Sequence, residues 1–270
     1  MNKLDKNNHS FIICAYKESP YLEECVKSLL NQTVNSPVYI STSTPNEHIK
    51  NIAKKYNVKL MINTKTKGHA NDFNFAYEQA KTKYVTLCHQ DDIYHKKFAE
   101  LTIKKMKKSK KPIISFTNYC ELRNDKVVKN NKLLIVKRLI NFPLLIFKKS
   151  KKVRLFTLSI GNAICAPTIS YNKEIVEKAV IDNGFKSNLD WISYIELAKL
   201  NGSFVYIRKP LLYRRIHEES LTTNVIANQI KREEDYKIFR MFWKEKTAKR
   251  LLKLYSTSEK SNNINWQSIL

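Results

Sequence analysis

Residues 67–94 read KGHANDFNFAYEQAKTKYVTLCHQDDIY and combine a helical pattern with a strand pattern. The spacing predicts a helix over 71–80, and the apolar run Tyr84–Cys88 is typical of a buried strand. That strand ends in the polar stretch His89–Asp92. Two adjacent carboxylates at a strand end do not belong to a core. They either face solvent in a turn or bind a hard divalent cation, which prefers oxygen ligands.

Earlier segments repeat the same alternation. Short apolar runs predict strands at 11–15, 38–40 and 58–62, and the spacing between them predicts helices that begin at Ser19-Pro20 and at Glu47. Strands that alternate with helices at this spacing favour βαβ units and a parallel sheet. Ligands bind at the carboxyl ends of the strands in such sheets, so 15–18 and 89–92 are the candidate binding edges.

The second half of the chain is expected to contain a strand at 169–171, a helix at 173–180, a helix opened by Leu189-Asp190-Trp191 and a strand at 204–207. The chain ends in a basic, aromatic-rich segment with helical spacing. We therefore expect a helical extension at the C-terminal end.

The chain has 270 residues, with 49 Lys and Arg against 24 Asp and Glu, and a net charge of +25. Such a surplus indicates a polyanionic or membrane-surface partner, or else reflects a composition rich in Lys, Asn and Ile. Residues 126–154 carry ten Lys or Arg and no acid. Apolar clusters inside this segment favour a surface helix or hairpin that lies on anionic lipid. The alternative is a solvated helix face beside a core helix.

The cysteines and the N-terminal residues bear on the cellular compartment in which the protein is expected. The five cysteines include no CxxC pair, so neither a disulfide framework nor a zinc ribbon is expected. Residues 1–10 are polar and lack the apolar core of a signal peptide, and the sequence has no apolar run of about 18 residues. We expect a reduced cytoplasmic protein, peripheral at the inner face of the cell membrane.

Four segments together resemble family 2 glycosyltransferases of the GT-A fold, of the bacterial surface-polysaccharide type. They are residues 67–94, FIICAYKESPYLEECVKSLLNQT at 11–33, GNAICAP at 161–167 and FKSNLDWISYIELAKLNGSFVYIRKPLLYRRIHEESLTTN at 185–224. Their order and separations make the resemblance specific over residues 10–225. Two positions depart from the family pattern. His89 stands where the first Asp of an Asp-x-Asp metal motif is usual, and Ser41–Thr44 lacks the carboxylate that usually reads the base.

The resemblance implies an α/β fold of the GT-A type. This fold is a Rossmann-like, mostly parallel central sheet flanked by helices, here with a C-terminal helical extension. The resemblance divides the chain into a glycosyltransferase domain at 1–225 and a helical basic tail at 226–270. Within the domain, the implied parts are a nucleotide-binding half at 1–95, a basic helical insertion at 96–154 and an acceptor half at 155–225.

The resemblance also implies the site. Asp190 is expected to be the general base of an inverting transfer; the alternative role, compatible with the first, is the N-cap of a helix that starts at Trp191. Asp91 is expected to hold Mn2+ or Mg2+, with His217 and His89 as further metal ligands. The alternatives are a contact with the diphosphate for His217 and a hydrogen bond to the ribose or sugar for His89. The donor, a nucleotide-diphosphate sugar, is expected to contact Ala15, Tyr16, Glu18, Thr42, Asn74, Gln90, Asp91 and Arg215.

Several side chains keep open alternatives. Asp92 either helps the metal site or only shapes the turn. Arg214 or Arg215 pairs with the diphosphate, because guanidinium groups bind such anions in a bidentate way. Asp72 or Asn74 contributes to nucleotide recognition in place of the missing carboxylate. Trp191 packs beside the acceptor or in the core.

The expected function is transfer of a sugar to a glycan or lipid-linked acceptor in cell-surface polysaccharide synthesis. One rival is a catalytically inactive, GT-A-like scaffold at the membrane, motivated by His89 and the missing carboxylate. The other is a basic nucleic-acid-binding protein, but the sequence has no helix–turn–helix pattern, and we expect no nucleic acid partner. Metal-dependent nucleotide binding separates the enzyme from the scaffold. A steep salt dependence of oligonucleotide binding would support the second rival.

Overall fold

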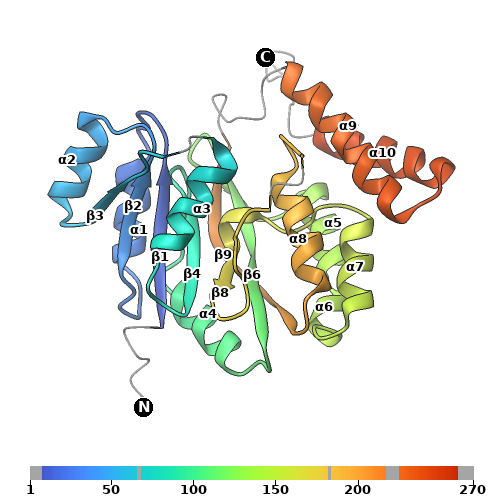
Figure 1. The fold of residues 1–270 in the computed structure, drawn as a ribbon, viewed down its shortest axis with the longest axis horizontal. Coiled ribbons are helices and arrows are strands. Elements are labelled where there is room, and N and C mark those ends of the chain that lie inside the picture. The colour runs from blue at the N-terminus through green and yellow to red at the C-terminus, as the bar shows by residue number, and fades with distance from the viewer. Residues whose placement is uncertain (1–7, 66–67, 182–183, 217–224, 261–270) are drawn as a thin grey trace.

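The computed structural model describes residues 8–65, 68–181, 184–216 and 225–260, and it shows one central sheet flanked by helices (Figure 1). The sheet has nine strands in the order β3-β2-β1-β4-β8-β6-β9-β5, and β7 pairs with β6. The α/β architecture expected from the sequence is therefore confirmed.

The first four strands form the parallel half of the sheet: β1 (His9–Ala15), β2 (Val38–Thr42), β3 (Lys59–Ile62) and β4 (Tyr84–His89). β1 lies between β2 and β4 and is parallel to both. The register places Ala15 opposite Thr42 and Cys14 opposite His89. The carboxyl ends of these three strands therefore meet at one edge, as the alternating pattern predicted.

Helices connect these strands: α1 (Leu22–Leu30), α2 (Glu47–Lys55) and α3 (His69–Gln79). α2 begins where expected, because the side-chain oxygen of Asn46 accepts the N–H of Ile49 at 2.9 Å and caps the first turn. α1 begins later than the Ser19-Pro20 pair suggests. Ser19 Oγ accepts the N–H of Tyr21 at 3.3 Å and so closes a turn ahead of the helix.

The second half of the sheet is mixed. It contains β5 (Ile93–Tyr94), β6 (Pro112–Arg123), β7 (Lys126–Val128), β8 (Ser170–Asn172) and β9 (Ser203–Ile216). β6 and β9 run parallel to each other, whereas β8 is antiparallel to both of its neighbours, β4 and β6. β8 thus joins the parallel half to the long β6–β9 pair.

The helical insertion expected at 96–154 is only partly helical. Its helices are α4 (Phe98–Lys107), α5 (Lys132–Asn141), α6 (Pro143–Ile146) and α7 (Lys151–Ser159). The prediction is wrong for 112–128, which forms β6 and β7. Ile113, Ile114 and Phe116 of β6 are fully buried, so this stretch belongs to the core of the sheet. The lysines that dominated the sequence pattern lie outside this apolar run.

The C-terminal extension consists of helices over its described part. α8 (Leu189–Lys199) precedes it, and α9 (Val225–Phe242) and α10 (Glu245–Lys260) form it. Trp191 of α8 is fully buried, and its ring lies 5.3 Å from the ring centroids of both Phe239 and Tyr255. Trp191 is therefore a core residue that joins α8 to the extension. Within the described ranges, no helix is both long and apolar enough to cross a membrane.

The helix expected at 173–180 does not form. These residues make turns after β8, and Lys173 Nζ donates to the carbonyl oxygens of Tyr77 and Ala80 at 2.9 and 2.7 Å. Val180 is held by two hydrogen bonds, at 2.8 and 2.9 Å, with the side-chain amide of Asn74. Contacts with α3 and its end therefore override the local helical pattern.

Candidate active site

The carboxyl ends of β1 and β4 are tied together by the side chain of Gln90. Its amide oxygen accepts the backbone N–H of Tyr16 at 3.0 Å, and its amide N–H donates to the carbonyl of Tyr16 at 2.9 Å. The ring of Tyr16 stays 51% exposed at this edge. Thr42 ends β2 opposite Ala15, and its hydroxyl accepts the N–H of Thr44 at 3.0 Å. Four of the expected donor contacts therefore lie along one edge of the sheet.

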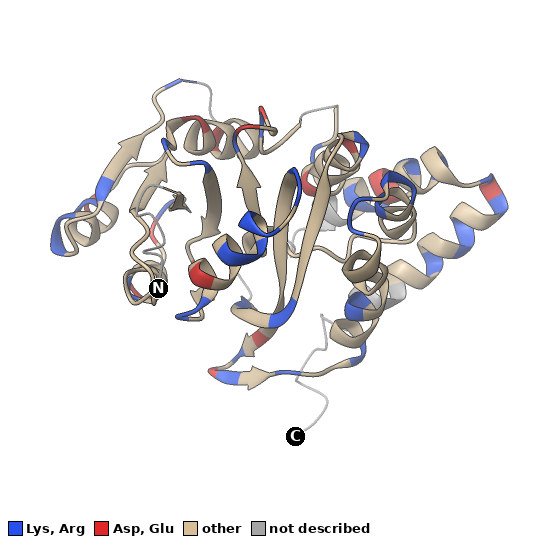
Figure 2. Cartoon of the chain, turned by 90° about the horizontal axis from the view of Figure 1, so that it is seen from below, with Lys and Arg blue, Asp and Glu red and all other residues tan. Residues whose placement is uncertain are grey.

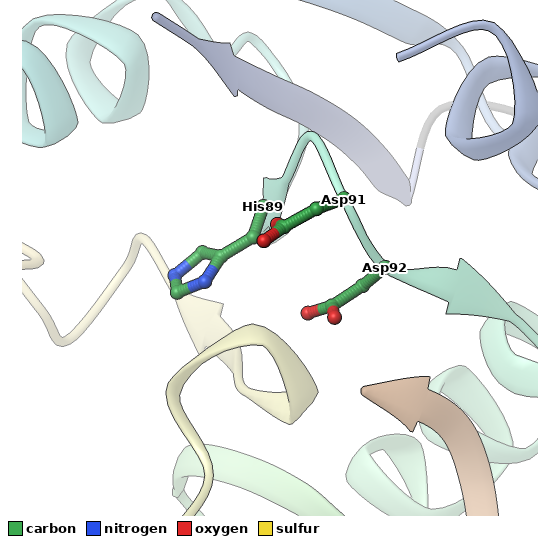
Figure 3. Close-up of side chains that lie close together, drawn as sticks. All are labelled: His89, Asp91 and Asp92. Carbon is green, nitrogen blue, oxygen red and sulfur yellow. The ribbon is translucent and has the colours of Figure 1, made fainter. Parts of the chain in front are cut away.

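His89, Asp91 and Asp92 form a group of candidate metal ligands at the end of β4 (Figure 3). One ligand atom from each lies within 4.8 Å of the other two, and the three side chains point to the same side of the turn. Asp92 is only 2% exposed. Its Oδ1 accepts the backbone N–H of Arg215 at 3.0 Å, and its buried Oδ2 has no hydrogen-bond partner among the described residues.

Burial sets the protonation of two members of this group. Burial, followed by the charge of Asp91, raises the pKa of Asp92 to about 8. Burial lowers the pKa of His89 to about 4, so its imidazole is neutral at pH 7. A neutral imidazole can ligate a metal, and a nearby cation favours the ionised form of a buried carboxyl group. The residues present therefore fit a divalent cation, and Asp92 belongs to the group as well as shaping the turn.

Arg215 holds the Asp91–Asp92 turn from β9. Its backbone N–H binds Asp92, and its Nε donates to the carbonyl oxygen of Asp91 at 3.2 Å. Its guanidinium group forms ion pairs with Glu24 and, at 3.2 Å, with Asp125, and lies 4.3 Å from the centroid of the Tyr21 ring. The cation expected to contact the donor is therefore already engaged in protein contacts.

Arg214, the neighbour of Arg215, is half-buried, and its guanidinium group forms no hydrogen bond or ion pair with the described residues. Its charge acts on the pKa of His89 and on that of the Cys165 thiol. Burial is the main cause that raises the pKa of Cys165, and Asp92 and Asp190 raise it further. Of the two arginines, Arg214 is therefore the one whose guanidinium group is not already held by contacts with the described residues.

Asp190 lies in the first turn of α8. Its Oδ2 accepts the amide N–H of Asn162 at 2.9 Å, and its Oδ1 accepts the backbone N–H of Trp191 at 2.7 Å. The alternative role as N-cap of a helix starting at Trp191 is wrong, because α8 starts at Leu189 with Asn188 as its N-cap. The two hydrogen bonds hold the carboxylate in one orientation, and Asn162 is a contact that the sequence did not single out.

The model of the family described as Glycosyl transferase family 2 matches residues 10–179 of this chain. The chain belongs to glycosyl transferase family 2. It is a glycosyltransferase, and its activity is transfer of a sugar from a nucleotide-sugar donor. No curated protein matches the chain.

Solved structures share the GT-A fold of this glycosyltransferase. S. aureus TarS 1-349 is 17% identical with a TM-score of 0.58, and the similarity covers 97% of this chain and 74% of that one. The complex of TarS 1-349 with UDP-GlcNAc is 17% identical with a TM-score of 0.57, covering 97% and 76%. The mannosyltransferase PcManGT from Pyrobaculum calidifontis, in complex with GDP-Man and Mn2+, is 13% identical with a TM-score of 0.62, covering 97% and 72%. At these identities the likeness concerns the fold.

In this glycosyltransferase, Asp72 and Asn74 of α3 have different surroundings. Asp72 accepts a hydrogen bond from the hydroxyl of Ser43 and another from the amide of Asn63, each at 2.8 Å. A carboxylate therefore does stand at the end of β2, although it comes from α3. Asn74 is engaged with Val180 through both ends of its amide, so its side chain is already held by protein contacts away from the end of β2.

His69 also lies in this region, although no sequence motif singled it out. Burial lowers the pKa of its imidazole, and Asp190 raises that pKa in part. The His69 ring lies 4.6 Å from the ring centroid of Phe73, which in turn lies 5.7 Å from that of His89. The signal in the sequence was its place directly after Gly68, at the first residue of a helix that begins beside the sheet edge.

Two further residues were expected at the site, Glu18 and His217. Glu18 is exposed just beyond β1. His217, expected as a metal ligand, lies outside the described residues.

Proposed function

We propose that this glycosyltransferase is an inverting enzyme that moves a sugar from a nucleotide-diphosphate sugar to a glycan or lipid-linked acceptor in cell-surface polysaccharide synthesis. The observation that best supports the proposal is the placement of Asp190. Its two carboxylate oxygens accept hydrogen bonds from the amide of Asn162 at 2.9 Å and from the backbone N–H of Trp191 at 2.7 Å, so the carboxylate is held in one orientation at the start of α8.

In this proposal, His89, Asp91 and Asp92 hold Mn2+ or Mg2+. Their N and O ligand atoms suit these ions, and the unpartnered Oδ2 of Asp92 offers an acceptor inside the group. When bound, the cation supplies positive charge that stabilises the leaving diphosphate. PcManGT, whose structure contains GDP-Man and Mn2+, provides a precedent on the same fold.

The donor lies along the edge formed by β1, β2 and β4. Tyr16 offers an exposed aromatic face, and Asp72 offers a carboxylate at the end of β2. Arg214 binds the diphosphate, whereas Arg215 keeps the metal-binding turn in place. TarS binds UDP-GlcNAc and PcManGT binds GDP-Man, so the panel of donors to test begins with these two nucleotides.

Asp190 is the general base. It accepts the proton of an acceptor hydroxyl while that oxygen attacks the anomeric carbon from the face opposite the diphosphate. The bond from the anomeric carbon to the diphosphate oxygen breaks, its electron pair leaves with the diphosphate, and the configuration of the sugar inverts. Asn162 orients the base, because its amide N–H holds the Oδ2 of Asp190 at 2.9 Å.

The test compares Asp190→Asn with Glu196→Gln, a control on the same helix whose carboxylate pairs with Lys199 on that helix. Cell membranes that contain acceptor are mixed with a labelled donor, and transfer of label is measured. Asp190→Asn is expected to lose at least about 1000-fold in rate while it still binds nucleotide, since base catalysis and positioning both fail. Transfer by Asp190→Asn at the rate of the control would show that Asp190 is not the base.

A further inference from the structure

We propose that the face formed by α5, α6 and α7 docks on an anionic lipid surface. These helices lie together at the side of the molecule opposite α2 and β3 (Figure 1). The described part of the chain exposes fourteen large apolar side chains, and half of them lie in this region. The exposed fraction of these seven runs from 47 to 66%, and they are Ile135, Val136, Leu139, Phe142, Ile146, Phe147 and Phe156.

Four of these residues form one stripe. Ile135, Leu139, Phe142 and Ile146 follow one another at the intervals that keep side chains on a single helix face. Phe142, the one residue between α5 and α6, has helical backbone angles of φ −55° and ψ −43°, and Pro143 begins α6 directly after it. Leu134 faces the core and is buried, so the helix is amphipathic and its exposed face is apolar. Such a face is unusual on a protein that meets only water.

A basic hollow of about 260 Å³ lies where the chain leaves this stripe. Lys149 lines it from the α6–α7 connection, Lys151 lines it from the first residue of α7, and Lys110 and Lys111 line it from the connection before β6. None of these four lysines makes an ion pair with a described residue. The hollow therefore gathers unpaired cations from two segments that are distant in the sequence.

Arg154 makes the hollow rigid. This buried side chain donates to the carbonyl oxygens of Lys149 at 3.1 Å, Leu200 at 2.7 Å and Gly202 at 2.6 Å. It therefore fixes the lysine-bearing connection against the turn between α8 and β9. The lysine backbones are held in place before any ligand arrives.

Charge decides which occupant fits this face. Residues 126–154 carry ten Lys or Arg and no acid, and Figure 2 shows blue segments outnumbering red ones over the molecule. A second copy of the chain would set like charges against each other. An anionic bilayer complements both features of this face, because its acyl chains bury the apolar stripe and its headgroup phosphates pair with the lysines of the hollow. This inference does not rest on the proposed function, since lipid binding is measured without nucleotide.

The chain provides a matched control for the basic hollow. A second hollow, of about 430 Å³, is lined by Lys50, Lys54 and Lys59 of α2 and β3, at the opposite side of the molecule. If only the net charge of the molecule determines lipid binding, and the position of the lysines does not matter, both hollows should contribute equally to it. Comparing them separates a docking surface from the effect of composition.

The experiment is co-sedimentation of the full chain with vesicles of phosphatidylcholine, with and without phosphatidylglycerol. Wild type is expected to bind only vesicles with phosphatidylglycerol, and more weakly as salt is raised. Lys149→Gln with Lys151→Gln is expected to weaken binding roughly 30-fold, and Lys54→Gln with Lys59→Gln to leave it nearly unchanged. Leu139→Ser with Ile146→Ser is expected to weaken it about tenfold or more, whereas Leu30→Ser, another exposed apolar site, has no such effect.

Melting curves of all variants establish that they remain folded. Equal binding of wild type to neutral and anionic vesicles, or equal losses from the two lysine pairs, would overturn the proposal. A wild type that is dimeric in sedimentation velocity and becomes monomeric on Leu139→Ser with Ile146→Ser would also overturn it, since the face would then bind a second copy.

Discussion

Glu234 of α9 accepts the backbone N–H of Asn188, the N-cap of α8, at 2.9 Å. The same buried carboxylate accepts the N–H groups of Lys186 at 2.7 Å and of Ser187 at 2.9 Å. A side chain of the C-terminal extension thus organises the segment that leads into Asp190. The extension is therefore part of the framework of the site, in addition to covering the core.

Glu234→Gln is expected to lower kcat about tenfold or more while the affinity for nucleotide stays near that of wild type. The amide cannot accept three N–H groups as the carboxylate does, so the start of α8 and Asp190 with it lose their fixed position. The exposed neighbour Glu233, changed to Gln, is the control. The measurement is steady-state kinetics with separate nucleotide-binding titrations. A parallel loss of kcat and nucleotide affinity would indicate general loosening of the fold, and would contradict a positioning role.

Asp92 makes the stability of the metal-free protein depend on pH. Its pKa is raised to about 8 when folded, against about 3.9 when unfolded, so the folded state holds the proton more strongly. This contribution to stability is fully present below about pH 4 and is lost as pH rises through about 8. Between about pH 6.5 and pH 8, wild type is expected to lose about 2 kcal/mol of unfolding free energy that Asp92→Asn retains.

Urea denaturation of both proteins at these two pH values tests this expectation. Adding Mn2+ is expected to reduce the pH dependence of wild type, because a nearby cation favours the ionised carboxyl group. Added Mn2+ is also expected to raise the unfolding free energy of Asp92→Asn by less than that of wild type. If wild type and Asp92→Asn show the same change in unfolding free energy over this range, the carboxyl group does not titrate as described.

Adjacent arginines are expected to respond differently to the same substitution. Arg215→Met removes the hydrogen bond to Asp91 and the ion pairs with Glu24 and Asp125, and should lower the unfolding free energy by about 2 kcal/mol. Arg214→Met should instead raise the KM for the donor about tenfold or more, with a smaller loss of stability. Denaturation and donor kinetics of the two variants decide this. If Arg214→Met lost stability and Arg215→Met raised the KM for the donor, the roles assigned here to the two side chains would be wrong.

Much of the candidate site at the carboxyl ends of β1, β2 and β4 was predictable, because it depends on local patterns. The apolar runs before Ala15 and His89 specify strands, and parallel neighbours bring strand ends together. The polar turn at Asp91-Asp92 then follows from its place in the sequence. Contacts between distant segments were not predictable in this way. The carboxylate of Asp72 at the end of β2 is placed by tertiary packing. So is the hydrogen bond from the backbone of Arg215 to Asp92 in the turn after β4.

Two errors have specific physical causes. The sequence pattern predicts a helical insertion that includes 112–128 because lysines flank these residues, but the apolar run at 112–116 packs as part of a central strand. Residues 173–180 have a helical pattern, but Lys173 binds the carbonyl groups at the end of α3 and Val180 binds Asn74. In both places long-range contacts determined the structure, and no single-segment pattern contains them.

Thermal unfolding with nucleoside diphosphates, with and without Mn2+, tests the central claim most directly. One nucleotide is expected to raise the Tm of wild type by about 5 °C only when Mn2+ is present, and the shift should vanish in Asp91→Ala. A folded wild type that no nucleotide stabilises, or a shift that is independent of both Mn2+ and Asp91, would contradict a metal-dependent glycosyltransferase built on the end of β4.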